Sequence, residues 1–388
     1  LKPYTYQFVN GKRETVGNKY KITGNTVSFD VKAYNKSTTL VIDPSLVFSS
    51  FSRSTADNWG FTATYGADGS FFGGGIAQPT GFPVTAGAIQ STGGGGSGTG
   101  GVPPDIAIIK LSPDGRNRIY ATYLGGNGLD QPHSLVADGA GNLVIAGRTN
   151  SGSSFPGSLV PAGSAGGGYD IFVTKINATG TAIIGSSRIG GAGNDGVNIT
   201  DTRGGANSLQ RFYGDDGRSE VILDGAGNIL VASSTQSSNF PIVGGFQASS
   251  GGGLQDAVLL KFNANATALI WSTYMGGAAN DAGFVLAINP TSPSNIYVGG
   301  GTASPGFPGT GAGVLQSTFG GGLADGYVAH VRDNGGSVSM VRSTYLGTGN
   351  IDMVYGVQFD AMGFPYVMGT TTGNWTVVNA AYSVPNSR

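Results

Sequence analysis

The sequence predicts an all-β fold, a β-propeller built from four-stranded antiparallel blades. Three observations support this prediction: an internal repeat, four short β-prone runs in each copy, and glycine-rich turns between the runs. Copies of the repeat begin at Asp105, Asp170, Asp256 and Asp325. Their starts are 65, 86 and 69 residues apart (170−105, 256−170, 325−256), a spacing that suits one blade per copy.

The composition favours a turn-rich β protein over several other classes. Glycine accounts for 70 of 388 residues, and charged residues make up only 11%, against about 25% in ordinary soluble domains. The net charge is −1 and no basic block occurs, so no nucleic-acid partner is expected. No apolar run reaches the ~18 residues that span a bilayer, so a membrane-spanning segment is not expected. Cysteine is absent, which excludes disulfides and thiolate zinc sites.

Residues 1–45 differ from the rest of the chain. Apolar and polar residues alternate there between turn signals such as Asn10-Gly11, and the segment is rich in lysine. We therefore expect two domains: the end of an N-terminal β-rich domain at 1–45 and the propeller repeats at 46–388. Residues 46–52 match the last run of each copy, which predicts an outer strand there.

Each copy contains two short turns and one long connection. Asp-Gly turns such as 138–142 and 112–117 join the first run to the second and the third to the fourth. The second-to-third connection is long, glycine-rich and usually begins with Phe-Pro, as at 155–156. Because strands alternate in direction, the short turns share one face of a propeller and the long loops share the other. We expect partners to dock on the long-loop face.

The first of the four runs in each blade is predicted to be its innermost strand. Five such strands are expected, so the sequence predicts at least five blades. The sequence ends inside the fifth long loop, which leaves the last blade incomplete: either it lies beyond Arg388 or the ring is incomplete. The five predicted innermost strands are 59–64, 133–137, 219–223, 283–288 and 354–359.

A cation recurs at one position of the third run, as Lys110, Lys175, Lys261 and His330. Such regular recurrence indicates packing rather than ligand binding. We expect an apolar stem along the blade face, with the charged head reaching a carboxylate.

The repeat resembles a known family. The runs DIAIIKL, IYATYLGG, GNLVIAGRT and Phe-Pro, in this order around residues 105–156, are similar to the SBBP β-propeller repeat, and the resemblance extends over about 46–388. Residues 42–46 (IDPSL) also resemble the junction that precedes such repeats. The resemblance implies a large bacterial secreted or cell-surface protein. In Bacteroidetes such proteins often end in a type IX secretion sorting domain, so the resemblance also implies a cargo of that pathway.

Glycine-rich runs such as GGNGLD at 125–130 are similar to the calcium-binding GGxGxD nonapeptide. Calcium rungs, however, need such nonapeptides in tandem, whereas here the aspartates are 65, 86 and 71 residues apart (195−130, 281−195, 352−281). We therefore expect no cofactor and expect each aspartate to accept backbone N–H bonds in a blade-to-blade turn; calcium is the alternative. The aspartates concerned are Asp130, Asp195, Asp281, Asp352 and, less regularly spaced, Asp57.

The second copy carries an insertion at 197–218 that gathers charged and aromatic residues in a chain poor in charge. Exposed loops on rigid scaffolds are where binding residues concentrate, although a solvated surface loop is the alternative interpretation. The candidate binding residues are Arg203, Arg211, Phe212, Tyr213 and Arg218.

No catalytic motif is found. The only histidines, His133 and His330, lie outside any HExxH pattern, and neither a G-x-S-x-G elbow nor a phosphate-binding GK[ST] occurs. We expect a non-enzymatic, extracellular or cell-surface module, associated with an outer membrane, for binding, adhesion or assembly. Its partner would be a surface or secretion-system protein or an extracellular glycan. The alternative is a polysaccharide-active propeller enzyme, which would need carboxylates or histidines clustered at the central channel.

Overall fold

The structure is a computed structural model. It describes residues 4–23, 26–43, 50–95, 103–164, 166–198, 209–210, 215–375 and 378. The chain falls into a small unit, residues 1–51 with 114–117, and a large unit, residues 52–113 with 118–388.

The small unit contains two antiparallel sheets. Strand β1 (Tyr4–Val9) pairs with β2 (Lys12–Thr15) on one side and β5 (Leu40–Asp43) on the other, while β3 (Asn18–Thr23) and β4 (Thr26–Val31) form a hairpin. The predicted Asn10-Gly11 turn joins β1 to β2, and both residues have positive φ (50° and 75°), as a type I′ hairpin turn requires.

Among its described residues, the large unit contains three four-stranded antiparallel sheets, one five-stranded sheet and one two-stranded sheet, which we number as blades 1 to 5 in chain order. Blade 1 consists of β6 (Asn58–Tyr65), β7 (Phe71–Ala77), β8 (Asp105–Leu111) and β9 (Arg118–Leu124). Blade 2 consists of β10 (Asp130–Ala137), β11 (Leu143–Thr149), β13 (Asp170–Ile176) and β14 (Ile183–Ile189), with β12 (Ser158–Leu159) added in parallel beside β14.

Blades 3 to 5 follow the same order. Blade 3 consists of β15 (Glu220–Leu223), β16 (Ile229–Thr235), β17 (Asp256–Phe262) and β18 (Leu269–Met275). Blade 4 consists of β19 (Asp281–Ile288), β20 (Asn295–Thr302), β21 (Asp325–Asp333) and β22 (Val338–Leu346). Blade 5 has β23 (Asp352–Phe359) and β24 (Pro365–Thr371) among the described residues. Two short 3₁₀ turns, η1 (Gly152–Ser154) and η2 (Asp215–Gly217), complete the large unit.

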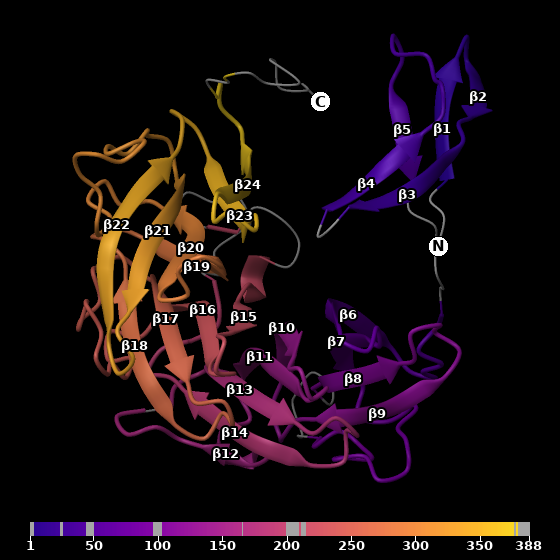
Figure 1. The fold of residues 1–388 in the computed structure, drawn as a ribbon. Coiled ribbons are helices and arrows are strands. Elements are labelled where there is room, and N and C mark those ends of the chain that lie inside the picture. The colour runs from indigo at the N-terminus through magenta and orange to yellow at the C-terminus, as the bar shows by residue number, and fades with distance from the viewer. Residues whose placement is uncertain are drawn as a thin grey trace. The chain divides into compact units, whose positions relative to one another are not determined.

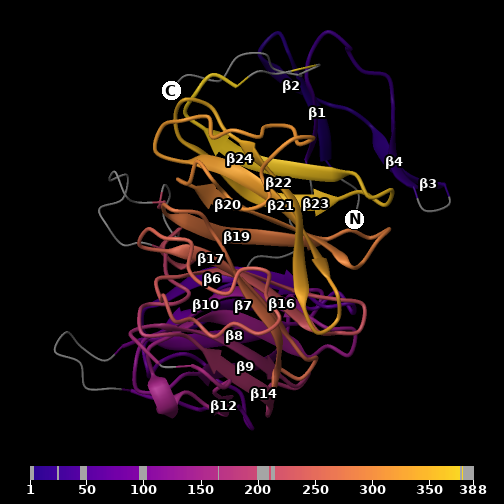
Figure 2. The same ribbon diagram turned by 90° about the vertical axis from the view of Figure 1, so that its left-hand side faces the viewer.

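Within the large unit the sheets follow one another in chain order, with the first strand of each blade innermost and the fourth outermost (Figure 1). Seen from the side, successive sheets are stacked face to face (Figure 2). The predicted all-β class, the four-stranded antiparallel blades and the positions of the innermost strands are therefore confirmed. The outer strand predicted at 46–52 is not confirmed. Residues 50–52 are not in a strand, and residues 46–49 lie outside the described residues.

The core lies between neighbouring blades. Val144 and Val173 of blade 2, for example, pack with Val231 and Leu260 of blade 3, and all four side chains are at most 1% exposed. Further apolar clusters join blades 1 and 2, 3 and 4, and 4 and 5. Strands buried on both faces are expected in a propeller, which explains the nearly continuous apolar runs in β8, β13 and β17.

The recurring cation of the third strand behaves as predicted in two blades. Lys175 Nζ lies 2.8 Å from an oxygen of Asp138, and Lys261 Nζ lies 2.9 Å from an oxygen of Asp224. Both aspartates are in the short first turn of the same blade. The other two positions differ: Lys110 lies over the ring of Phe72, 4.8 Å from its centre, and His330 stacks on Tyr297 with the ring centres 4.6 Å apart.

Candidate functional site: a central pocket where the innermost strands converge

A β-bulge interrupts the innermost strand of four blades at the same place. The antiparallel register shifts at one residue in each case: Phe61 in β6, His133 in β10, Phe284 in β19 and Tyr355 in β23. A bulge leaves one residue out of the ladder and re-aims its side chain. The three later bulges each lie three residues after the aspartate that begins the strand, so the repeat itself sets their position.

In blade 3 the insertion occupies the place of the bulge. Glu220 pairs with Ala232 as Ser134 pairs with Ala146, so Ser219 corresponds to His133. His133 follows its strand-initial aspartate by 3 residues (133−130), whereas Ser219 follows Asp195 by 24 (219−195). The insertion therefore enters the innermost strand itself, 21 residues (24−3) longer than the regular repeat. Its last residues reach the centre of the large unit.

The bulges and the end of the insertion surround one pocket, with a volume of about 360 Å³. All five blades contribute to it. We call it the central pocket; its walls combine aromatic, cationic and carboxylate side chains. The residues that give it this character are Phe61, His133, Arg218, Glu220, Phe284 and Tyr355.

Arg218 is held in the pocket by a fixed set of contacts. Its Nε donates to Asp215 Oδ1 at 3.1 Å, and its guanidinium lies 4.6 Å from the centre of the Tyr355 ring. The Tyr355 hydroxyl donates to the other carboxylate oxygen of Asp215 at 3.0 Å, and the Tyr355 ring stacks on Phe284 with centres 5.6 Å apart. Asp215 is fully buried, whereas the Arg218 side chain keeps 33% exposure. The arginine is therefore preorganised, with part of its surface open to a ligand.

Other lining residues of the pocket are polar. His133 Nδ1 lies 3.0 Å from the Ser219 hydroxyl, which in turn bonds to Ser233. Burial, together with Arg148, lowers the pKa of His133 well below its usual value, so its ring is neutral at pH 7. Glu220 accepts the backbone N–H of Leu286 at 2.6 Å, and burial raises its pKa to about 7. The pocket therefore offers a neutral histidine, a serine hydroxyl and a carboxyl group that is about half ionised at pH 7, beside Arg218.

The sequence identified only part of this pocket. Arg218 lies in it, whereas Arg203, Arg211, Phe212 and Tyr213 lie outside the described residues. The bulge residues were not identified as a set. Their signal was present in the fixed spacing of three residues after Asp130, Asp281 and Asp352.

The repeated aspartates accept backbone hydrogen bonds in the blade-to-blade turns, as predicted. Asp130, Asp195 and Asp281 each accept the N–H of the glycine four residues earlier at 2.7–2.8 Å, and Asp352 accepts that of Thr348 at 2.6 Å. Asp57 is not the equivalent residue in blade 1. That place belongs to Asn58, which begins β6 and pairs with Ala77 as Asp130 pairs with Thr149.

The long loops are fastened to their blades. The Tyr274 hydroxyl accepts the N–H of Phe240 in the Phe-Pro pair and donates to the Ser237 carbonyl, and Tyr123 and Tyr345 repeat the arrangement with Phe82 and Phe307. Further along the loop, glutamine side chains bind the backbone of the turn glycine that follows the fourth strand. They are Gln90, Gln247 and Gln316. These hydrogen bonds hold the described parts of the long loops in fixed conformations. Docking of a partner on the long-loop face stays a prediction.

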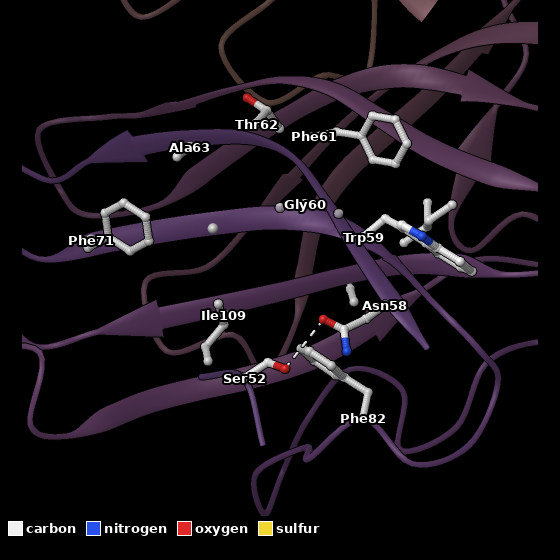
Figure 3. Close-up of a pocket in the computed structure, with 15 residues that line it drawn as sticks. Ser52, Asn58, Trp59, Gly60, Phe61, Thr62, Ala63, Phe71, Phe82 and Ile109 are labelled. Atoms are coloured by element: carbon white, nitrogen blue, oxygen red, sulfur yellow. Dashed lines mark hydrogen bonds between the residues drawn. The ribbon is translucent and has the colours of Figure 1, made fainter. Parts of the chain in front are cut away.

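A second hollow, of about 450 Å³, lies on blade 1 (Figure 3). Trp59, Phe71, Phe82 and Ile109 line it, and Ser52 donates a hydrogen bond to Asn58 at its edge. It has one apolar wall and no charged side chain among its lining residues. It is therefore a weaker candidate for specific recognition than the central pocket.

Comparison with known proteins supports the architecture. Residues 119–156 match the model of the SBBP beta-propeller repeat, and residues 1–45 match a domain of unknown function (DUF7948). No curated protein matches. The first match covers part of one copy of the repeat, from β9 into the long loop of blade 2, and agrees with a propeller module.

Several solved structures are distantly similar. A protein from Lactobacillus plantarum is 10% identical, with a TM-score of 0.39, over 95% of this chain and 75% of that one. A protein of unknown function from Dyadobacter fermentans is 11% identical, with a TM-score of 0.31, over 86% and 84%. An apocarotenoid oxygenase from Synechocystis is 12% identical, with a TM-score of 0.30, over 80% and 65%. Within the described residues, no helix has the length and apolar character needed to cross a membrane.

Proposed function

We propose that this chain is a non-enzymatic binding module that holds an extracellular glycan in the central pocket. The observation that carries the proposal is the insertion: it lengthens an innermost strand and ends with Arg218 in the pocket, where the repeat alone would place a bulge. A residue that interrupts a repeat is a better candidate for ligand binding than one that obeys it.

The chemistry of the pocket suits a sugar. The half-buried Phe61 ring can pack against the C–H face of a pyranose, and Arg218, His133 and Ser134 can bond to hydroxyl groups. Glycoside hydrolysis ordinarily uses two carboxyl groups facing the scissile bond, and Glu220 is the one carboxylate among the described lining residues. The nearby Asp215 is engaged by Arg218 and Tyr355. These features support binding over the polysaccharide-active alternative.

Location is part of the same proposal. The resemblance of the repeats to SBBP proteins supports a secreted or cell-surface module, associated with an outer membrane and exported as a type IX secretion cargo. Adhesion or assembly on a surface would then follow from glycan binding. A surface or secretion-system protein is the other class of partner.

The test is an array of extracellular polysaccharides and oligosaccharides probed with the purified chain. We expect selective binding that falls at least about tenfold in Arg218→Ala, since truncating an anchoring arginine costs more than ~1.4 kcal/mol. Lys110→Ala, which alters a cation outside the pocket, is the matched control and should bind normally. Equal binding by both variants would contradict the proposal. Release of reducing ends from a bound glycan would favour the enzyme.

A further inference from the structure

Two aspartates meet at each blade-to-blade junction, the turn that leads from the fourth strand of one blade into the first strand of the next. One begins the third strand of the earlier blade, and the other begins the innermost strand of the later blade. All eight side chains are at most 3% exposed. In chain order the pairs are Asp105 with Asp130, Asp170 with Asp195, Asp256 with Asp281, and Asp325 with Asp352.

The two carboxyl groups of a pair face the same small space. A Cβ atom on the intervening turn glycine would touch oxygens of both partners at the first three junctions: Gly125, Gly190 and Gly276 are the glycines concerned. The absence of a side chain there lets the carboxyl groups approach each other across the turn. Like charges brought this close in a buried site disfavour ionisation of both groups.

At the first and third junctions, donors bond to at most one oxygen of each carboxyl group. At the third junction, Asp281 Oδ2 accepts the N–H of Gly277 and the Ser304 hydroxyl, and Asp256 Oδ2 accepts the Ser250 hydroxyl. The Oδ1 atoms of both aspartates are buried without a hydrogen-bond partner in the described structure. The first junction is similar, since both oxygens of Asp105 and Oδ1 of Asp130 form no hydrogen bond of good geometry there. The donors nearest to these oxygens are the Gly94 and Gly95 N–H groups and the Thr149 hydroxyl, and the Thr302 hydroxyl is nearest to Asp281. Leaving such atoms ionised and unpaired is costly.

The second junction supplies a positive charge of its own. Arg188 stands where the other blades have Tyr123, Tyr274 and Tyr345, and its guanidinium forms an ion pair with Asp170. At the other junctions the groups that face the carboxyls are tyrosines: Tyr123 beside Asp105, and Tyr274, Tyr327 and Tyr345 around the third pair. Their hydroxyls are neutral. The repeats can therefore be compared with one another: the aspartate pair of the second junction has an arginine side chain beside it, and the pairs of the first and third junctions have tyrosines.

We propose that the aspartate pairs at the first and third junctions each share one proton in the folded protein, in the place of the positive charge that Arg188 provides at the second. The shared proton lets one carboxyl group donate to the other, which satisfies the oxygens that otherwise lack partners. The protons at the blade junctions then stabilise the folded propeller, and its free energy of unfolding falls as the pH rises.

The direction of the pH dependence follows from the pKa values. Burial, with the charge of Asp130, raises the pKa of Asp105 to about 8, and burial raises the pKa of Asp281 to about 7 and that of Asp256 to about 6. Burial also raises the pKa of Asp195 at the second junction to about 6, so this residue adds to the pH dependence of every variant. In the unfolded chain an aspartate titrates near 3.9. The folded protein therefore binds more protons above about pH 4, and the stability they contribute is fully present below that pH and is lost as the pH rises through about 6 to 8.

The experiment is equilibrium unfolding of the full chain at pH 5 to 9, followed by the fluorescence of the buried Trp271. A Glu220→Gln background is used, since burial also raises the pKa of Glu220. We expect the unfolding midpoint to fall with pH. Asp105→Asn and Asp256→Asn should each flatten that fall by about one proton, since asparagine keeps the shape and can donate to the partner carboxylate. Asp170→Asn, at the junction that holds Arg188, should lower the midpoint at all pH values without such flattening.

Two outcomes would overturn the proposal. One is an unchanged pH dependence in the Asp105→Asn and Asp256→Asn variants. The other is stabilisation of the parent chain by calcium chloride and destabilisation by EDTA at pH 8, which would make the pairs cation sites. If the aspartate variants fail to fold, infrared spectroscopy of the Glu220→Gln chain decides: the band of a protonated, buried carboxyl group must be present at pH 6 and decline at pH 9.

Discussion

In blades 1, 3 and 4 a tyrosine hydroxyl holds the long loop to its blade, and removing this hydroxyl directly tests the contact. In Tyr274→Phe the ring remains and only the hydroxyl is lost. That hydroxyl donates to the Ser237 carbonyl at 2.6 Å and accepts the Phe240 N–H at 2.8 Å, and Tyr274 is 1% exposed. The substitution therefore leaves a buried acceptor and a buried donor without partners. At about 1–3 kcal/mol for each such group, with some recovery by relaxation, we expect a loss of about 2–4 kcal/mol in the free energy of unfolding.

The assay is urea denaturation, with the m-value unchanged because the loop stays folded. Tyr345→Phe should cost nearly the same, since its hydroxyl bonds to the Ser304 carbonyl and the Phe307 N–H in the same way. Tyr366→Phe is the control: this residue is 63% exposed, and its substitution should change stability by less than about 0.5 kcal/mol. A loss below about 1 kcal/mol in Tyr274→Phe would refute the reasoning that these loops are held by the hydroxyl.

Two further predictions concern the blade junctions and the ion pairs between blades. Gly276→Ala should destabilise by more than about 2 kcal/mol, since its Cβ would overlap the Asp256 carboxylate, whereas Gly139→Ala, with open space around it, should be nearly neutral in the same urea assay. Lys261→Met should cost about 2–3 kcal/mol, because it leaves Asp224 and Asp333 without their cation; this is less than the ~3–5 kcal/mol of a fully buried pair because the two carboxylates keep 15% and 13% exposure. Arg116→Met, which breaks an exposed pair, should change stability by less than about 0.5 kcal/mol; a comparable loss in both variants would contradict the assignment.

Turns, strands and recurring ion pairs could be predicted because each depends on residues that lie close together in the sequence or recur at a fixed spacing. The Asp-Gly turns illustrate this: Asp138 accepts the backbone N–H groups of Ala140 and Asn142, and Gly141 takes the positive φ (80°) of the turn, all within five residues. Apolar runs between such turns marked the strands, and their repetition marked the blades. The lysine heads were predictable for the same reason, since Lys175 and Lys261 recur at a fixed place beside a recurring turn aspartate.

The amino-acid sequence by itself thus determined the fold class, the blade order and the innermost strands, because local turn chemistry and a regular period encode them. Only the tertiary structure decided what those strands bring together. Tyr355 meets Asp215 across 140 residues, and Asp256 meets Asp281 because a turn glycine between them has no side chain. The physical reason is that a bulge rotates one side chain out of a ladder and sheet stacking then sets its neighbours. The repeat marks where each bulge lies, but no local pattern shows which side chains of other blades it will meet.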